Sequence, residues 1–178
     1  AVIGFFATLY VARILGAEPL GIYNLAISLV SWLAIIGKAG VSGAISKRVS
    51  EGENPTQYAI AGGLIIGLLS AIAVTGLLIF RPVVNSYIGY PATGFVIIIL
   101  LVTLSYSLVN SLLTGLHLVH IQGILTTVRT STRSFLQIIA VYFGLNISGL
   151  FIGHIAGFAV VSLIGIYFFV KTTPEFRL

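Results

Sequence analysis

Three long apolar stretches of the sequence carry polar side chains at the spacing of one helix face. These side chains are Asn24, Ser28, Ser31 and Lys38 in the second apolar stretch, Thr103, Ser107, Asn110, Ser111, Thr114 and His117 in the fourth, and Thr126, Arg129, Arg133 and Gln137 in the fifth. Residues three, four or seven positions apart lie on the same side of an α-helix. Such a face is either hydrated or shared with another helix, and hydroxyl groups alone are compatible with simple helix packing.

The two arginines of the fifth stretch favour a hydrated face. Arg129 and Arg133 are one helical turn apart, and a charge inside a membrane costs at least about 2.5–3.5 kcal/mol on insertion scales. Such a charge normally faces a water-filled cavity or a partner. The alternative is that Arg129, and less readily the deeper Arg133, extends to the head groups at the cytoplasmic end of its helix. The same alternative applies to Lys38.

Transmembrane helices are the elements that must position these residues. The chain of 178 residues is 58% hydrophobic and 7% charged, with a mean hydropathy of +1.13, whereas soluble domains are roughly 25% charged. Apolar runs of about 20 residues cross the hydrocarbon as helices, whereas a barrel would show short alternating segments. The sequence predicts one all-α domain over 1–178, a polytopic transmembrane helix bundle of about six spans. The predicted spans are 1–15, 20–40, 58–80, 94–116, 124–144 and 147–170.

Connections are predicted where glycine, proline, asparagine and charge gather, at 16–21, 46–57, 81–94, 117–122, 144–148 and 171–178. Most basic residues fall on one side of this arrangement. They are Lys38, Lys47, Arg48, Arg129, Arg133, Lys171 and Arg177, with Arg13 and Arg81 on the other side. Because the basic side is normally cytoplasmic, 46–57 and 171–178 are predicted to lie inside and 81–94 outside. The net charge of +5 then indicates this topology and contact with anionic lipid head groups, not with nucleic acid.

Small residues predict where helices approach closely. Gly149, Gly153 and Gly157 form two consecutive G-x-x-x-G steps, and Gly63, Gly67 and Ala71 form a second ridge of small side chains. His154 lies between the glycines of the first ridge. We expect it to be a hydrogen-bonded interface residue, with a proton carrier as the alternative.

Enzymatic and metal-binding patterns are largely missing. The acids Glu18, Glu51, Glu53 and Glu175 all fall in connections, so the spans contain no carboxylate pair for acid–base or metal-assisted chemistry. The sequence has no cysteine and no Gly-rich phosphate loop. His117 and His120 are not accompanied by a carboxylate nearby in sequence. We therefore predict no enzyme, no metal site and no cofactor.

The stretch "ARILGAEPLGIYNLAISLVSWLAIIGKAGVSGAISKRVSEG", residues 12–52, resembles the amino-terminal signature of polysaccharide-biosynthesis flippases. These form the Wzx-like branch of the multidrug/oligosaccharidyl-lipid/polysaccharide exporter superfamily. The pattern is an apolar span ending in A-R-x-L-G, a short outer loop with an acid and a proline, G-x-Y opening a second span, and a basic cytoplasmic segment. It is carried here by Ala12, Arg13, Leu15, Gly16, Glu18, Pro19, Gly21, Tyr23, Lys47 and Arg48.

The resemblance implies a transporter that moves a polyprenyl- or dolichyl-diphosphate-linked oligosaccharide from the cytoplasmic to the outer leaflet. Such transporters have two lobes around a central cavity, so the present chain, which begins inside an apolar stretch, is expected to be the amino-terminal lobe of a longer protein. Its partners would be membrane lipids, the lipid-linked oligosaccharide and the carboxy-terminal lobe. The family often has an acid after the second span, where this sequence has Lys38.

Under this interpretation, basic side chains bind phosphate, and polar side chains of the three faces bind sugar. The phosphate candidates are Arg13, Lys38, Arg129 and Arg133, and the other candidate site residues are Asn24 and Asn110. The alternative for Arg13 is an outer-interface anchor that extends to the head groups or pairs with Glu18. Two other functions stay open: a cation-coupled drug or metabolite antiporter of the same superfamily, and a non-transporting membrane scaffold.

Overall fold

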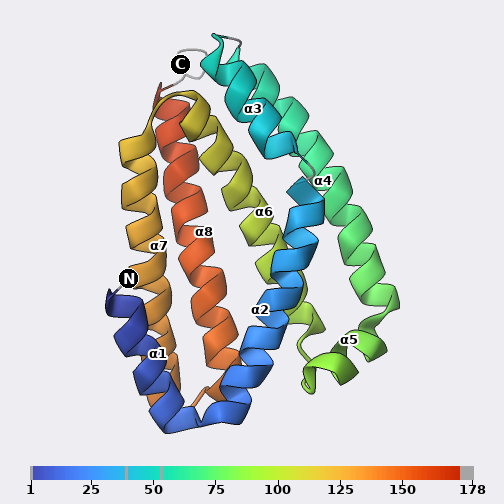
Figure 1. The fold of residues 1–178 in the computed structure, drawn as a ribbon, viewed down its shortest axis with the longest axis vertical. Helices are drawn as coiled ribbons and strands as arrows, with labels where there is room; N and C mark the ends of the chain where they lie inside the picture. The colour runs from blue at the N-terminus through green and yellow to red at the C-terminus, as the bar shows by residue number, and fades with distance from the viewer. Residues whose placement is uncertain (1, 39, 53, 173–178) are drawn as a thin grey trace.

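The chain folds into helices joined by short turns (Figure 1), and the computed structural model describes residues 2–38, 40–52 and 54–172. Within these ranges no β-strand occurs, which confirms the all-α class. Residues Glu53, Glu175 and Arg177, which entered the sequence analysis, lie outside the described residues. The helices are α1 (Val2–Leu15), α2 (Ala17–Lys38), α3 (Val41–Ser50), α4 (Pro55–Ile79), α5 (Arg81–Ile88), α6 (Thr93–Gly115), α7 (Val119–Tyr142) and α8 (Asn146–Thr172).

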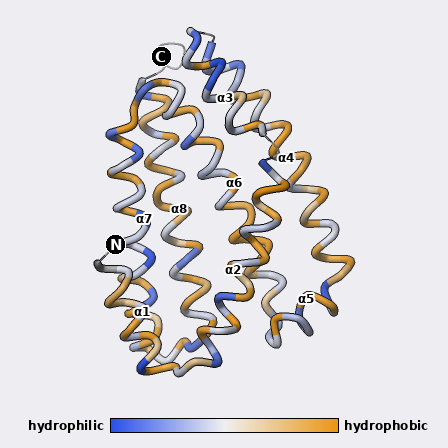
Figure 2. Tube along the Cα trace, in the orientation of Figure 1, coloured by the Kyte–Doolittle hydropathy of each residue, from blue (hydrophilic) through white to orange (hydrophobic). Residues whose placement is uncertain are grey.

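The long helices run up and down the molecule as a bundle. In Figure 1, α7 and α8 lie along one side, α3 and α4 along the other, and α6 between them. The α1–α2 and α7–α8 turns and α5 are at one end, while α3 and the α6–α7 turn are at the other. Figure 2 shows hydrophobic residues along the length of the helices and many of the hydrophilic ones near the two ends, as expected for a bundle that crosses a membrane.

Helices occupy all six predicted spans, but they differ in apolarity. By length and composition α2, α4, α6 and α8 can cross a membrane, and the apolar part of α1, Gly4–Leu15, is shorter. The 24-residue α7 is long enough to span, at about 1.5 Å per residue, but is not among the helices apolar enough to do so by composition. A helix of this composition can cross a membrane only if its neighbours, rather than its own hydropathy, stabilise it there.

The connection predicted at 46–57 is in part wrong, because α3 extends to Ser50. Ile45 and Val49, one helical turn apart, are both buried, and this apolar pair holds the amphipathic segment in helical form against the bundle. The chain then turns, and Asn54 begins α4 by accepting hydrogen bonds from the backbone nitrogens of Thr56 and Gln57.

The predicted loop at 81–94 is also in part wrong, because it contains α5. Pro82 at the start of a segment suits the first turn of a helix, and Ile88 is buried. The Oδ1 atom of Asn85 accepts from both the backbone nitrogen and the hydroxyl of Thr93, at 3.1 and 2.7 Å, so α5 caps the start of α6. The turn predicted at 117–122 is likewise shorter, since α7 begins at Val119.

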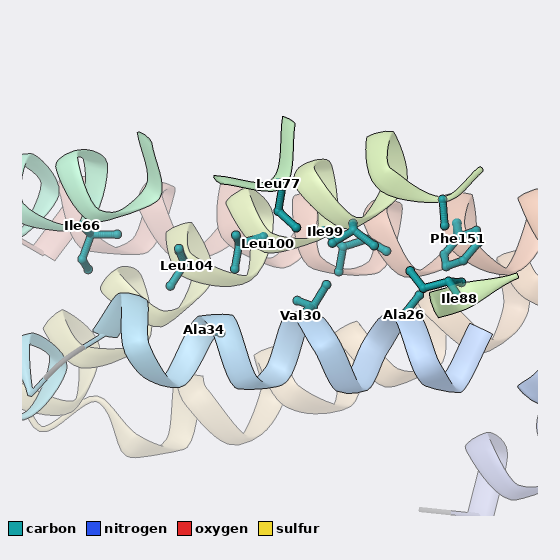
Figure 3. Packing of buried hydrophobic residues seen from close by; sticks show 12 residues of the cluster. Ala26, Val30, Ala34, Ile66, Leu77, Ile88, Ile99, Leu100, Leu104 and Phe151 are labelled. Carbon is teal, nitrogen blue, oxygen red and sulfur yellow. The ribbon is translucent and has the colours of Figure 1, made fainter. Parts of the chain in front are cut away.

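The main hydrophobic core lies between α2 and α6 and is closed by side chains of α4, α5 and α8 (Figure 3). On α2 the inward positions recur every four residues, at Ala26, Val30 and Ala34. Small side chains at these positions let α2 lie close to Ile99 and Leu104 of α6. Much of the outer surface of the same helices is apolar, as expected for faces that contact lipid.

The second predicted small-residue ridge is wrong as a site of close helix approach. A side chain added at Gly67 would meet no atom within 4 Å, and Ala71 is exposed. Both residues instead line a shallow groove of about 360 Å³ between α4 and α6. The close approach on α4 occurs at Gly62, where an added Cβ would lie 2.3 Å from the side chain of Ile45 on α3.

Candidate substrate-binding site between α1, α2, α7 and α8

The predicted glycine ridge on α8 is confirmed, and it sets the position of α7. A Cβ atom at Gly153 would lie 2.7 Å from Cγ of Gln137, and one at Gly157 would lie 2.9 Å from Cβ of Arg133. At Gly149 it would lie 2.6 Å from Cβ of Ala140. Because α8 has no side chains at these points, its backbone lies directly against the face of α7 that carries the polar residues.

Arg133 lines a pocket of about 200 Å³ where α1, α2, α7 and α8 meet. The Nε atom of Arg133 is buried and makes no hydrogen bond within the described part of the protein. A buried donor without a partner is costly, and Arg133 is also the one basic side chain among the residues that line this pocket. The pocket is lined by Thr8, Val11, Leu20, Tyr23, Asn24, Ile27, Arg133, Gln137 and Leu150.

The polar side chains around Arg133 form a hydrogen-bonded chain. The Nε2 atom of Gln137 donates to the backbone carbonyl of Leu150 at 3.0 Å and to the hydroxyl of Tyr23 at 3.2 Å. That hydroxyl is in turn 2.7 Å from Nδ1 of His154, which confirms His154 as a hydrogen-bonded residue of a helix interface. These bonds join α2, α7 and α8 and fix one wall of the pocket.

Arg129 has a different environment although it is one turn from Arg133. Its guanidinium carbon lies 4.8 Å from the ring centroid of Phe158 and 5.0 Å from that of Tyr106. The two rings meet edge to face, with an interplanar angle of 90°. The guanidinium is thus held by cation–π contacts with α6 and α8, and Arg129 is not among the pocket-lining residues.

The structure brings together only two of the six candidate site residues, Asn24 and Arg133. Lys38 is the last residue of α2 and is half-buried. Arg13 is exposed in the last turn of α1, and no ion pair joins it to Glu18 within the described ranges. Asn110 lies on α6, toward the α6–α7 turn, where its carbonyl accepts from Nε2 of Gln122 at 2.8 Å.

Helix packing accounts for much of the polar face of α6. Ser107 and Ser42 of α3 form a hydrogen bond of 3.2 Å, and the Ser111 hydroxyl donates to the carbonyl of Ser107. Thr114 donates to the carbonyl of Asn110 and accepts from Gln122. This face corresponds to the packing interpretation that the sequence left open.

Two larger hollows are less suited than the Arg133 pocket to bind an anion. The groove between α4 and α6 and a hollow of about 490 Å³ beside Glu18 and Tyr90 have no basic side chain among their lining residues. An anion in the second hollow would also face the carboxylate of Glu18. The Arg133 pocket therefore has a basic side chain that these two hollows do not have.

The pocket contains residues that the sequence analysis did not select as site residues. Tyr23 was singled out only as part of the G-x-Y pattern, Gln137 only as the end of a polar face, and Thr8 not at all. The spacing of Gln137 from Arg133 was a usable signal, because it continues the same helix face by one more turn. Thr8 had no such signal, since its place beside α7 depends on how α1 packs.

The sequence of the chain is similar to those of known proteins. Residues 1–178 match the family described as polysaccharide biosynthesis protein. The chain is 28% identical over 167 residues to a probable flippase AglR of Haloferax volcanii, covering 93% of this chain and 35% of that protein. It is 31% identical over 86 residues to a probable low-salt glycan biosynthesis flippase, Agl15, of the same organism, covering 48% of this chain and 18% of that protein.

The chain thus spans about a third of the length of the first of these relatives. No solved structure matches it. The four apolar helices and the flippase relatives together make it part of a multi-pass membrane protein. Because the family match extends over the whole sequence, the chain belongs to the polysaccharide biosynthesis protein family.

Proposed function

We propose that the protein containing this chain flips a lipid-linked oligosaccharide, carried on a polyprenyl or dolichyl diphosphate, to the outer leaflet of the plasma membrane. The family match and the relatives described as probable flippases support a role in glycan translocation. The observation that carries the proposal is Arg133, a cation inside an apolar bundle with a buried, unpaired Nε donor that faces no acid.

The composition of the pocket suits a diphosphate with an attached sugar. The guanidinium of Arg133 supplies charge and planar donors for phosphate oxygens. Asn24, Thr8 and the Tyr23 hydroxyl add neutral polar groups of the kind that bind sugar hydroxyls. The isoprenyl tail of such a substrate stays in the bilayer, so the pocket needs to receive only the polar part.

A second lobe would complete the site. The present pocket is partly open and is small compared with an oligosaccharide. In the proposed transporter, the carboxy-terminal lobe covers this side of α1, α2 and α7, and the headgroup crosses between the two lobes. Membrane lipids cover the apolar outer faces of α2 and α4.

The test replaces Arg133 in the full-length protein reconstituted in vesicles. Arg133→Ala is expected to lower the apparent affinity for the lipid-linked oligosaccharide about ten- to a hundredfold, since a hydrogen bond to a charged group contributes about 1.5–3 kcal/mol. Arg133→Lys is expected to restore only part of this loss, because lysine keeps the charge without the planar donors. Flipping is measured as protection of the sugar from an enzyme added outside the vesicles.

Arg48→Ala is the matched control, because Arg48 is exposed on α3 and pairs only with Glu51 within the described residues. It removes the same charge from the chain and is expected to leave flipping unchanged. Full activity of Arg133→Ala at unchanged protein level would contradict the proposed role of the pocket. Equal losses in the Arg48 and Arg133 variants would show an effect of net charge rather than of a binding site.

A further inference from the structure

The Tyr23 hydroxyl connects the Arg133 pocket to a buried imidazole. Tyr23 lines the pocket, and its oxygen is 2.7 Å from Nδ1 of His154, a side chain that is only 5% exposed. The Nε2 atom of Gln137 approaches the same oxygen at 3.2 Å. Because an amide nitrogen can only donate, the Tyr23 oxygen accepts this bond. The phenolic O–H can then donate a hydrogen bond either to His154 or to a group in the pocket.

The protonation state of His154 decides where that phenolic proton goes. With a neutral imidazole whose proton is on Nε2, the Nδ1 atom accepts from the Tyr23 hydroxyl. With a charged imidazole, Nδ1 carries a proton and must donate to the Tyr23 oxygen. The oxygen then accepts from both Gln137 and His154, and its own O–H turns away from them, toward the pocket that Tyr23 lines.

Two positive charges on α7 lie near His154. On α7, Arg133 carries the pocket charge beside Gly157, and Arg129 lies over Phe158, whose ring stacks on His154 at 5.0 Å. The other titratable groups that face this cluster are the phenols of Tyr23 on α2 and Tyr106 on α6.

The same helices supply almost no negative charge. The described parts of α6, α7 and α8 contain no acidic residue, and α2 has an acid only in its first turn. A proton on His154 therefore adds a further positive charge that nothing in this part of the protein compensates. An anion bound at Arg133 supplies that compensation and accepts the hydrogen bond from the turned Tyr23 hydroxyl.

We propose that diphosphate binding in the Arg133 pocket is linked to protonation of His154 through Tyr23. This inference rests on the proposed function of the pocket. One proton from water forms an N–H bond at Nδ1 when the anion binds and returns to water when the anion leaves, and no other covalent bond changes. Transport of an anionic headgroup through this lobe is then accompanied by proton movement, with His154 as the carrier.

The linkage fixes the direction of the pH dependence. If the bound state holds one more proton than the free state, affinity rises as pH falls, by up to about tenfold per pH unit for a full proton.

Calorimetry on the purified full-length protein tests this linkage, with geranyl diphosphate as the probe. Binding heats in two buffers of different ionisation enthalpy give the number of protons taken up. We expect proton uptake in the wild-type protein, less uptake in Tyr23→Phe with the diphosphate still bound, and uptake reduced to that of the probe itself in His154→Asn. Inorganic diphosphate, titrated in parallel, shows whether the isoprenyl chain contributes.

His120→Asn is the matched control, since His120 is exposed on the first turn of α7 and lies outside the pocket. It should leave both affinity and proton uptake unchanged. Unchanged uptake in both the Tyr23 and the His154 variants would overturn the linkage while leaving the diphosphate site intact. Failure of the wild-type protein to bind the probe would overturn the proposed site itself.

Nitrogen NMR of the histidine-labelled wild-type protein gives a second answer, in which a variant is needed only to assign the signal. The signal missing from His154→Asn identifies His154, and the shift of its Nδ1 atom reports protonation. We expect that shift to move toward the charged form when geranyl diphosphate is added at constant pH. A shift that stays at the neutral value under saturation would contradict the proposal.

Discussion

Arg133 and Arg129 show how the surroundings of a residue decide what its charge can do. The guanidinium of Arg129 lies over two aromatic rings, a contact that contributes about 2 kcal/mol or more where water is excluded. Arg133 has no such rings, and its Nε atom makes no hydrogen bond in the described structure. The first arginine is therefore held by helix packing, whereas the second lines the pocket that we propose binds the diphosphate.

We expect Arg13 and Arg133 to differ in how well a lysine can replace them. Arg13 is exposed in the last turn of α1 and does not line the pocket, where a positive charge of any shape suits the helix dipole and the lipid interface. We predict that Arg13→Lys retains flipping and that Arg13→Ala lowers the amount of protein in the membrane. Flipping per molecule and protein level are measured together.

A loss of flipping in Arg13→Lys at unchanged protein level would contradict this prediction. It would instead support the interpretation from the sequence, in which Arg13 contacts the diphosphate with its planar donors.

At the scale of elements, the α7–α8 pair determines the shape of the site. The glycines of α8 bring its backbone against α7, and the hydrogen bonds of Gln137 tie the two helices to each other and to α2. The pocket is therefore formed by the closest helix contact in its neighbourhood, and a shift between these helices would change the position of Arg133.

We predict that Gly153→Ala and Gly157→Ala destabilise the protein by about 1–3 kcal/mol each, as overpacking does in a tight interface. The added methyl groups would meet Gln137 at 2.7 Å and Arg133 at 2.9 Å. Thermal unfolding of the purified full-length protein provides the measurement. Gly123→Ala is the control, since a Cβ atom there meets nothing within 4 Å, and an equal loss in this variant would argue against the packing explanation.

The sequence was sufficient to predict the long helices but not the short ones. The apolar runs of about 20 residues and the G-x-x-x-G steps on α8 are local patterns, and both are confirmed. The second half of α3 and all of α5 were predicted as connections because charged residues, and in α5 a proline, are typical of loops. Buried side chains such as Val49 and Ile88 keep these segments helical. Their stability comes from packing on helices distant in sequence, which local composition does not show.

The candidate site was predictable only in part for the same reason. The periodicity of α7 indicated its polar face, but Arg129 and Arg133 could not be told apart without the positions of Tyr106 and Phe158. Tyr23 and His154 are 131 residues apart in sequence. A contact at that distance depends on how the whole bundle packs.

At the scale of the whole molecule, the basic residues at the two ends predict its orientation. Lys47 and Arg48 at the end of α3 lie at one end of the bundle, and Arg81 at the start of α5 lies at the other. The end with α3 has the larger number of basic residues and is predicted to face the cytoplasm.

Cysteine labelling tests this orientation, because the chain has no native cysteine. We predict that an impermeant thiol reagent on intact cells modifies Ser86→Cys and spares Ser50→Cys, in a full-length protein whose other cysteines are removed. Both positions are exposed, and lysed cells provide the control in which both react. The opposite labelling pattern would reverse the assignment.

The polarity of α7 has a consequence for how the protein is made. This helix leaves the ribosome before α8, and each of its two arginines opposes entry into lipid by about 2.5–3.5 kcal/mol near the membrane centre. Contacts that offset this cost come from Tyr106 on α6 and from Phe158 and the glycine backbone on α8. Because most of these contacts come from α8, we predict that α7 and α8 enter the bilayer together as a hairpin. We therefore expect the glycines that position α8 against α7 to contribute to membrane insertion as well as to the shape of the pocket.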